Sequence, residues 1–196
     1  MRYLLFIIYI ITLPNVKPAI PKRIKITVGF YDAMNAQLTR ELLSAIAIQY
    51  NADVLLQPKV QVLPTITFYK PRNRYRADLI LQYLNQLPGY HNYYLAVTSH
   101  DISTTNGKFY DWGIMGLGYQ PGKSCVISTY RLKTPNTTLF NDRVIKVALH
   151  EIGHNLGLPH CKYSTTCYME DAVGTIKTID RETRELCSHC KNLLRH

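Results

Sequence analysis

The sequence predicts an α/β fold of the α+β kind, in which helices pack on a mixed β-sheet. Strand and helix patterns alternate in the first half of the chain, and several strand patterns then precede one long amphipathic helix. The 196 residues are 46% hydrophobic, which is enough for one domain with a single hydrophobic core.

Four segments of the first half have clear periodicity. They are the strands Arg23–Phe30 and Ala52–Leu63 and the helices Asn35–Tyr50 and Arg76–Leu87. Asn35 can cap the first helix, whereas Pro58 interrupts the second strand and Pro88 stops the second helix.

The second half begins with an apolar run, Asn92–His100, which is typical of an inner strand. Trp112–Gln120 and Ser124–Leu132 are predicted to form a hairpin, because a Pro-Gly-Lys turn joins them. A helix then begins at Asn141 or Asp142, since either side chain can serve as N-cap. Its core-facing stripe consists of Ile145, Leu149, Ile152 and Leu156.

The formal net charge is +10, and the densest basic run is Tyr69–Asp78, which mixes arginines with tyrosines. A net positive charge is compatible with binding to nucleic acid, to an anionic membrane surface or to acidic substrates. We interpret the run as a solvated loop that enters a helix, because no stacking motif or groove-reading fold accompanies it. No nucleic-acid partner is therefore expected.

Residues 1–20 carry the pattern of a signal peptide or an N-terminal anchor. One arginine precedes the apolar run Tyr3–Leu13, which is short for a bilayer span but matches a secretory hydrophobic region. A cut after Ala19 would leave Lys17 where a small residue is preferred, so an uncleaved anchor and a buried first strand stay open. The prolines nearby disfavour the strand.

We therefore expect an exported protein that is secreted, periplasmic or anchored in a membrane by its N-terminal segment. Contact with a membrane is expected only if the leader is uncleaved, and a cytoplasmic location follows if the segment is not a signal. Residues 21–196 are expected to form the functional domain, and to act as a monomer.

The stretch from His150 to His160, HEIGHNLGLPH, places three histidines, a glutamate and a glycine at fixed offsets. On a helix, His150 and His154 share one face with Cβ atoms about 5–6 Å apart, so both imidazoles can bind one zinc ion. Glu151 is rotated away from this pair but can reach a water on the metal, which is the position of a general base.

Gly157 can end this helix, because glycine adopts a left-handed conformation at little cost. The chain can then turn back and offer His160 as a third ligand, which leaves one position open as in catalytic zinc sites. All five fixed positions match by chance in roughly one chain of this size in 10⁵. Gly153 costs the helix about 1 kcal/mol relative to alanine, which indicates close packing beneath the site.

Four of the five cysteines crowd into the C-terminal segment. An odd total and this clustering favour a metal site with one spare thiol, Cys125, over a disulfide framework. Disulfides remain the alternative, because export would permit them. The clustered cysteines are Cys161, Cys167, Cys187 and Cys190.

The extended histidine motif, followed by a methionine, resembles the metzincin clan of zinc peptidases. The cysteines are similar to those of the archaemetzincin family: a cysteine directly after the third histidine, a second cysteine within C-x-M, seventeen residues, and C-x-x-C. The sequence departs from that pattern in one gap, since five residues separate Cys161 from Cys167 where the family typically has four.

The resemblance implies a zinc metallopeptidase that hydrolyses peptide or protein substrates with Glu151 as general base for a zinc-activated water. It implies a metzincin-like, mostly parallel twisted sheet with helices, an active-site helix and a small C-terminal zinc-knuckle subdomain. Met169 is expected as the Met-turn residue, an apolar floor under the zinc ligands. Two Zn²⁺ ions per chain are expected, a catalytic ion on His150, His154 and His160 and a structural ion on Cys161, Cys167, Cys187 and Cys190.

Three smaller expectations follow. Ile179–Leu186, with Asp180 as N-cap, is predicted as a short helix that delivers Cys187, and His189 is expected to be exposed rather than a ligand. Gly113–Gln120 is predicted as the sheet edge that pairs with an extended substrate. A non-hydrolytic zinc-binding interaction protein with the same fold is the alternative function.

Overall fold

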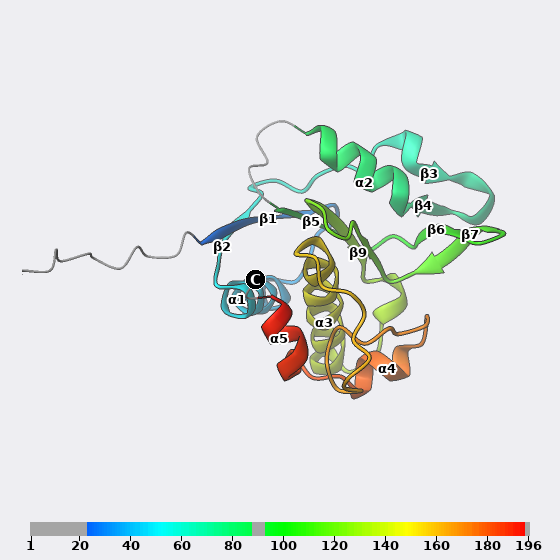
Figure 1. The fold of residues 1–196 in the computed structure, drawn as a ribbon. Coiled ribbons are helices and arrows are strands. Elements are labelled where there is room, and N and C mark those ends of the chain that lie inside the picture. Colours follow the sequence, from blue (N-terminus) through cyan, green and yellow to red (C-terminus); the bar gives the residue numbers. More distant parts are fainter. Residues whose placement is uncertain (1–22, 88–92, 195–196) are drawn as a thin grey trace, which may run out of the picture.

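The computed structural model describes residues 23–87 and 93–194, which are built around a five-stranded sheet of order β2-β1-β5-β9-β8 (Figure 1). β1 (Ile24–Phe30) pairs in parallel with β2 (Ala52–Leu56) and β5 (Tyr93–Thr98). β9 (Ser124–Ser128) is parallel to β5, and β8 (Gly116–Gly118) is antiparallel to β9 at the edge. The prediction of a mixed, mostly parallel sheet is confirmed.

Helices cover both faces of this sheet, as parallel strands require. α1 (Ala36–Tyr50) and α3 (Thr137–Asn155) pack together on one face, and α2 (Ala77–Gln86) lies on the other (Figure 1). All residues of β9 are buried between these layers, including the two serines at its ends. β9 ends at Ser128, and the remainder of the predicted strand forms the 3-10 turn Tyr130–Leu132.

The N-caps of α1 and α3 show which helix starts could be predicted from local sequence. Asn35 accepts hydrogen bonds from the backbone N–H groups of Gln37 and Leu38, as predicted. The prediction that α3 begins at Asn141 or Asp142 was wrong, because Asn136 caps it more than one turn earlier. Asn141 and Asp142 lie inside the helix, where their side chains bond to Glu41 and to basic residues instead.

A second sheet, not predicted from the sequence, lies beside the first and has the order β3-β4-β6-β7. Its strands are β3 (Phe68–Tyr69), β4 (Arg74–Arg76), β6 (Ile102–Asn106) and β7 (Phe109–Ile114). The Asn106-Gly107 pair between β6 and β7 is a strong hairpin signal that could have revealed it. The predicted strand Trp112–Gln120 is consequently divided, with its first part in β7 and its middle in β8.

The basic run Tyr69–Asp78 is not a solvated loop, contrary to its interpretation from sequence. It contains the 3-10 turn Lys70–Arg72, strand β4 and the start of α2, and the 3-10 turn Thr65–Thr67 precedes it. Arg76 is 2% exposed and donates to both carboxylate oxygens of Asp78 at 3.0 Å. Arg74 and Arg76 are therefore paired with carboxylates inside the fold, whereas Lys70 and Arg72 are exposed.

The C-terminal segment follows α3 and packs beside it (Figure 1). It contains α4 (Ile176–Arg181) and α5 (Ser188–Leu193), so the predicted helix Ile179–Leu186 was wrong. Asp180 lies within α4 and accepts two hydrogen bonds of 2.7 Å from Arg143, which prevents it from acting as N-cap. Cys187 is delivered instead by a non-helical stretch, and is the N-cap residue of α5.

The predicted signal peptide or anchor, residues 1–20, lies outside the described residues. Among residues 23–87 and 93–194, no helix combines the length and apolarity that crossing a bilayer requires.

Candidate active site

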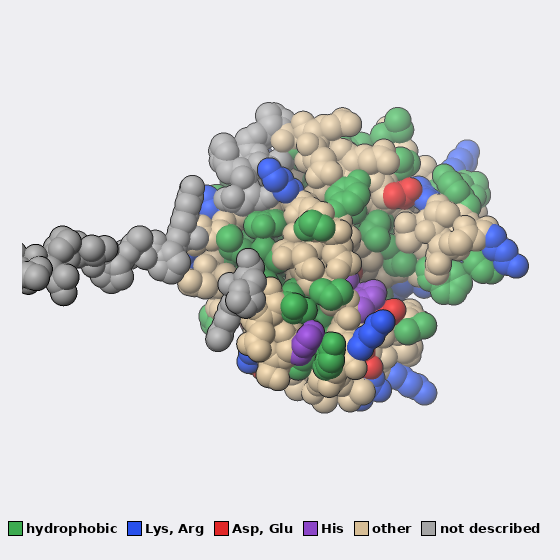
Figure 2. Space-filling model, in the orientation of Figure 1, with side chains coloured by type: hydrophobic (Ala, Val, Ile, Leu, Met, Phe, Trp, Pro, Cys, Tyr) green, Lys and Arg blue, Asp and Glu red, His purple; other side chains and the backbone are tan. Residues whose placement is uncertain are grey.

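A cleft of about 890 Å³ lies between the edge strand β8, helix α3 and the segment that follows the third histidine. His150, Glu151, His154 and His160 all line it, so the sequence motif faces a cavity large enough for a peptide segment. Histidine atoms reach the surface on the face drawn in Figure 2, beside acidic and basic side chains.

The three histidines converge as predicted. The candidate ligating atoms of His150, His154 and His160 all lie within 4.8 Å of one another. The Nε2 atoms of His150 and His154 are 2.9 Å apart. Gly157, at φ 94°, ends α3 and reverses the chain, which brings His160 over the helical pair.

Backbone carbonyls orient the two helical imidazoles. Nδ1 of His150 donates to the carbonyl oxygen of Tyr168 at 2.7 Å, and Nδ1 of His154 donates to that of Leu158 at 2.8 Å. This arrangement leaves both Nε2 lone pairs directed into the cluster, as in zinc sites. Three imidazoles at these separations fit a zinc ion with Zn–N distances of about 2.0–2.1 Å.

Burial keeps the helical histidines in the neutral form that binds metal. Burial, together with His154, lowers the pKa of His150 to about 3. Burial also lowers the pKa of His154. Asp171, which sequence reasoning missed, places Oδ2 3.5 Å from Nδ1 of His160, so a carboxylate orients the third ring.

Glu151 lies against strand β8, on the side of α3 that faces the cleft. A Cβ atom on Gly116 would fall 2.4 Å from Oε1 of Glu151, and one on Gly118 would fall 2.8 Å from the Glu151 carbonyl oxygen. The two glycines therefore allow the strand to approach the helix at the position of the carboxyl group. Burial raises the pKa of Glu151 to about 8.

Asn155 fixes the β8–β9 hairpin to the active-site helix, a role that the sequence did not reveal. Its Nδ2 donates to the carbonyl oxygens of Tyr119 and Ser124, each at 2.9 Å. The Asn155 carbonyl oxygen accepts from Gly122 N at 3.1 Å. The edge strand is thereby held at a defined distance from Glu151.

Met169 lies beneath α3, as expected of the Met-turn residue. It is fully buried, and a Cβ atom on Gly153 would fall 2.5 Å from its sulfur. Gly153 thus provides the close packing that its place in the helix indicated. The Met169 carbonyl oxygen accepts from Cys161 N at 2.6 Å, which joins this floor to the residue after His160.

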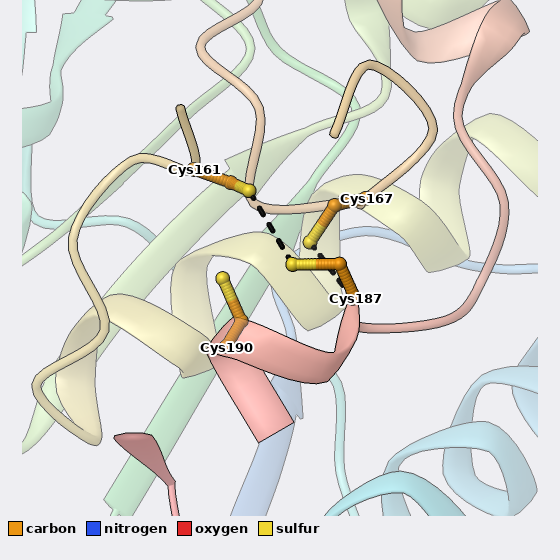
Figure 3. A group of neighbouring side chains, drawn as sticks. All are labelled: Cys161, Cys167, Cys187 and Cys190. Atoms are coloured by element: carbon orange, nitrogen blue, oxygen red, sulfur yellow. Dashed lines mark hydrogen bonds between the residues drawn. The ribbon is translucent and has the colours of Figure 1, made fainter. Parts of the chain in front are cut away.

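The four C-terminal cysteines form a second cluster, in which the thiols point toward one another (Figure 3). Their sulfurs lie within 4.8 Å of one another, and those of Cys161 and Cys187 are 3.6 Å apart. All are free thiols, at separations far beyond the disulfide length of about 2.05 Å. A tetrahedral zinc with Zn–S distances of about 2.3 Å fits this donor set.

The additional residue between Cys161 and Cys167 does not prevent this convergence, since residues 162 and 163 of the loop between them are exposed. His189 stays outside the cluster and stacks on Tyr163, with ring centroids 3.8 Å apart. Cys125 is buried in β9, is not part of the cluster, and donates to the Tyr94 carbonyl oxygen.

Comparison with known proteins gives consistent matches over most of the chain. The model of Peptidase family M54 matches residues 19–196. The archaemetzincin of Halobacterium salinarum is 30% identical over 165 residues, which cover 80% of this chain and 91% of the relative.

Comparison with solved structures also matches this chain to archaemetzincins. The crystal structure of archaemetzincin from Methanopyrus kandleri has a TM-score of 0.77 at 26% identity, covering 88% of this chain and 94% of that one. The crystal structure of archaemetzincin from Archaeoglobus fulgidus, complexed with malonate, has a TM-score of 0.73 at 28% identity, covering 86% and 99%.

Proposed function

Because this chain belongs to Peptidase family M54, the archaemetzincin family, and is a zinc-dependent metallopeptidase, we propose that Glu151 is its general base and that His150, His154 and His160 hold the catalytic zinc. The observation that carries this proposal is the convergence of three oriented imidazoles beside a buried carboxyl group in one cleft. When bound, the zinc ion supplies a Lewis acid that acidifies water and polarises the scissile carbonyl group.

Glu151 accepts and then donates the proton that the reaction transfers. Its carboxylate takes a proton from the attacking water and later passes it to the nitrogen of the leaving amine. Burial raises the pKa of Glu151 to about 8, and the positive charge of a zinc ion on the three histidines would lower this pKa and favour the ionised carboxylate that accepts the proton. The contact with Gly116 and Gly118 holds the carboxyl group at the edge of the strand.

The substrate lies along Gly113–Gln120 in an extended conformation. β8 pairs with β9 on one side only, and residues of this segment line the cleft beside Glu151. An edge strand offers unpaired backbone groups, which can hydrogen-bond to a peptide as if it were another strand. Backbone pairing would orient the scissile bond toward the histidine cluster without demanding a particular sequence.

The cysteine cluster holds a second, structural zinc ion. Four sulfur ligands close a tetrahedral site and leave no position for substrate. Because Cys161 directly follows His160, a metal on the cysteines would restrain the third catalytic ligand. Each chain then carries two zinc ions with different roles.

The decisive experiment compares wild type with Glu151→Gln. Wild type is expected to cleave peptides from a random library, and the variant to lose cleavage while retaining about two zinc ions per chain by elemental analysis. Undiminished cleavage by Glu151→Gln would reject the role of Glu151. Zinc binding without cleavage by wild type would favour the alternative of a non-hydrolytic zinc-binding protein.

We also propose that residues 1–20 direct export and that the domain acts as a monomer. The apolar run Tyr3–Leu13 supports export. Cell fractionation of the full chain and of a chain without residues 1–20 tests the location, and light scattering of the purified protein tests the oligomeric state.

A further inference from the structure

The active-site cleft extends beyond the histidines toward α4. Lys146 and Val147 lie one turn before His150 on α3, and both line this extension together with Ile176 and Ile179. The side chains of Val147, Ile176 and Ile179 give it apolar walls. A side chain of a substrate bound beside His150 can therefore enter a pocket with hydrophobic sides.

Glu182 lies in the lining of this extension and is 6% exposed. Within residues 23–87 and 93–194, no hydrogen-bond donor reaches its buried Oε1 atom. A buried carboxyl oxygen without a donor is costly to a folded protein and calls for a partner from outside.

The neighbouring cations already have carboxylate partners other than Glu182, although Asp142 is shared between Lys146 and Arg184. Nζ of Lys146 lies 2.6 Å from Asp142 and donates to the Ile179 carbonyl oxygen at 3.0 Å. Arg181 donates to both carboxylate oxygens of Glu170 at 2.7 Å. Glu182 is consequently the acidic group of this part of the cleft that has no cationic partner of its own among the described residues.

We propose that Glu182 forms the polar end of a substrate pocket that selects a lysine or arginine side chain next to the scissile bond. This inference rests on the proposed function, since the pocket adjoins the catalytic histidines. The aliphatic stem of a lysine or arginine packs against Val147, Ile176 and Ile179, while its charged end donates to Glu182. A shorter side chain leaves the carboxyl group of Glu182 unpaired, and an acidic side chain is repelled by it.

The electrostatics of Glu182 are consistent with this pairing. Burial, and then the nearby charge of Glu170, raise the pKa of Glu182 to about 8, against the smaller effects of Lys146 and Arg181. An opposite charge inside the pocket would favour the ionised carboxylate. Binding of a cationic side chain at neutral pH should therefore release a proton.

A binding experiment tests the pocket without turnover. Zinc-loaded Glu151→Gln protein is incubated with an equimolar random hexapeptide pool, and the retained peptides are sequenced by mass spectrometry. Lysine and arginine should be enriched over methionine at one position by roughly 10-fold or more, as expected for a charge-assisted hydrogen bond. Adding Glu182→Gln should abolish this enrichment.

Two further variants make the result specific. Glu185→Gln removes an exposed acidic group near Glu182 in the sequence but outside the cleft lining, and should keep the enrichment. Glu182→Met should shift the preference at that position to leucine and methionine, and reports on the pocket if Glu182→Gln folds poorly. The proposal is overturned if the enrichment is equal with and without Glu182. It is also overturned if the protein that retains Glu182 prefers glutamine or acidic residues at that position.

Cleavage separates this inference from the proposed function. Wild type should cut the same pool beside lysine or arginine, and Glu182→Gln should cut it with that preference lost. Cleavage without any basic preference overturns the pocket and leaves the peptidase mechanism intact. Absence of cleavage by wild type, with basic peptides still retained by Glu151→Gln, rejects the mechanism and supports the pocket.

Discussion

Gly116 leaves the space that Glu151 occupies: a Cβ atom on Gly116 would lie 2.4 Å from Oε1 and 2.7 Å from Cγ of that side chain. The glycine belongs to the edge strand and the glutamate to the active-site helix, so the contact couples the proposed substrate edge to the proposed general base. The carboxyl group cannot keep its position if this strand carries a side chain here.

Gly116→Ala should reduce kcat/KM by roughly 100-fold, because a displacement of a catalytic group by about 1 Å costs this much. Zinc content should remain unchanged, since the three atoms that the new methyl group would meet most closely all belong to Glu151. Peptide cleavage and elemental analysis of the same preparation provide the measurement. Activity within twofold of wild type would show that Glu151 does not depend on this contact.

Asn155→Asp should lower stability by about 1–3 kcal/mol, because Asp cannot donate to the Tyr119 and Ser124 carbonyl oxygens. Activity should fall as well, since the hairpin that carries β8 is released from α3. Urea unfolding and cleavage assays report the two effects. Gln82→Glu, the same amide-to-acid change on an exposed part of α2, should leave both unchanged.

Gly153→Ala should destabilise the zinc-loaded protein despite the better helix propensity of alanine. The helix gains about 1 kcal/mol, whereas the Cβ atom meets the buried Met169 sulfur at 2.5 Å, and overpacking of this kind costs about 1–3 kcal/mol. A double-mutant cycle with Met169→Ala tests the cause. Additive changes in the free energy of unfolding would show that the two residues do not oppose each other.

Cys190→Ser should lower the zinc content from about two ions to about one per chain and should reduce activity, because His160 directly precedes Cys161. Elemental analysis after dialysis against a weak chelator gives the measurement. Cys125→Ser is the matched control, since that buried thiol lies outside the cluster and should leave zinc content unchanged. Loss of zinc in both variants would contradict the assignment.

Asp180→Asn should destabilise the protein at pH 6 by about 1–3 kcal/mol, because Arg143 is buried and loses its charged partner. The hydrogen bond from Arg143 lowers the pKa of Asp180 below its ordinary value of 3.8. A lowered pKa means that this stabilisation is complete above about pH 4 and is lost as the pH falls further.

The difference in unfolding free energy between wild type and Asp180→Asn should therefore shrink on acidification below about pH 4. Urea unfolding of both proteins at several pH values measures it, and the comparison cancels the loss of zinc that acid causes in each. A difference that stays constant down to pH 2 would exclude the ion pair as its source.

The sequence by itself determined those features that depend on neighbours along the chain. The helical repeat places His150 and His154 on one face whatever surrounds them, and Gly157 needs only its own conformational freedom to turn the chain toward His160. The cap at Asn35 is local in the same way. The histidine motif and the helix that carries it could therefore be predicted before any packing was known, whereas the set of four cysteines was predicted from the resemblance to a family.

Only the tertiary structure decided which distant segments meet. The contact of Gly116 with Glu151 and the pairing of Asp180 with Arg143 join residues that only packing brings together, and packing also places Glu182 in the cleft. Asp180 was predicted as an N-cap because the backbone N–H groups at a helix start are the best partners that its sequence neighbours offer. In the structure, the buried guanidinium group of Arg143 binds it more strongly. Helix propensity contributes about 1 kcal/mol per residue, whereas leaving a buried charge without its partner costs about 3–5 kcal/mol. Packing therefore decides the structure wherever the two conflict.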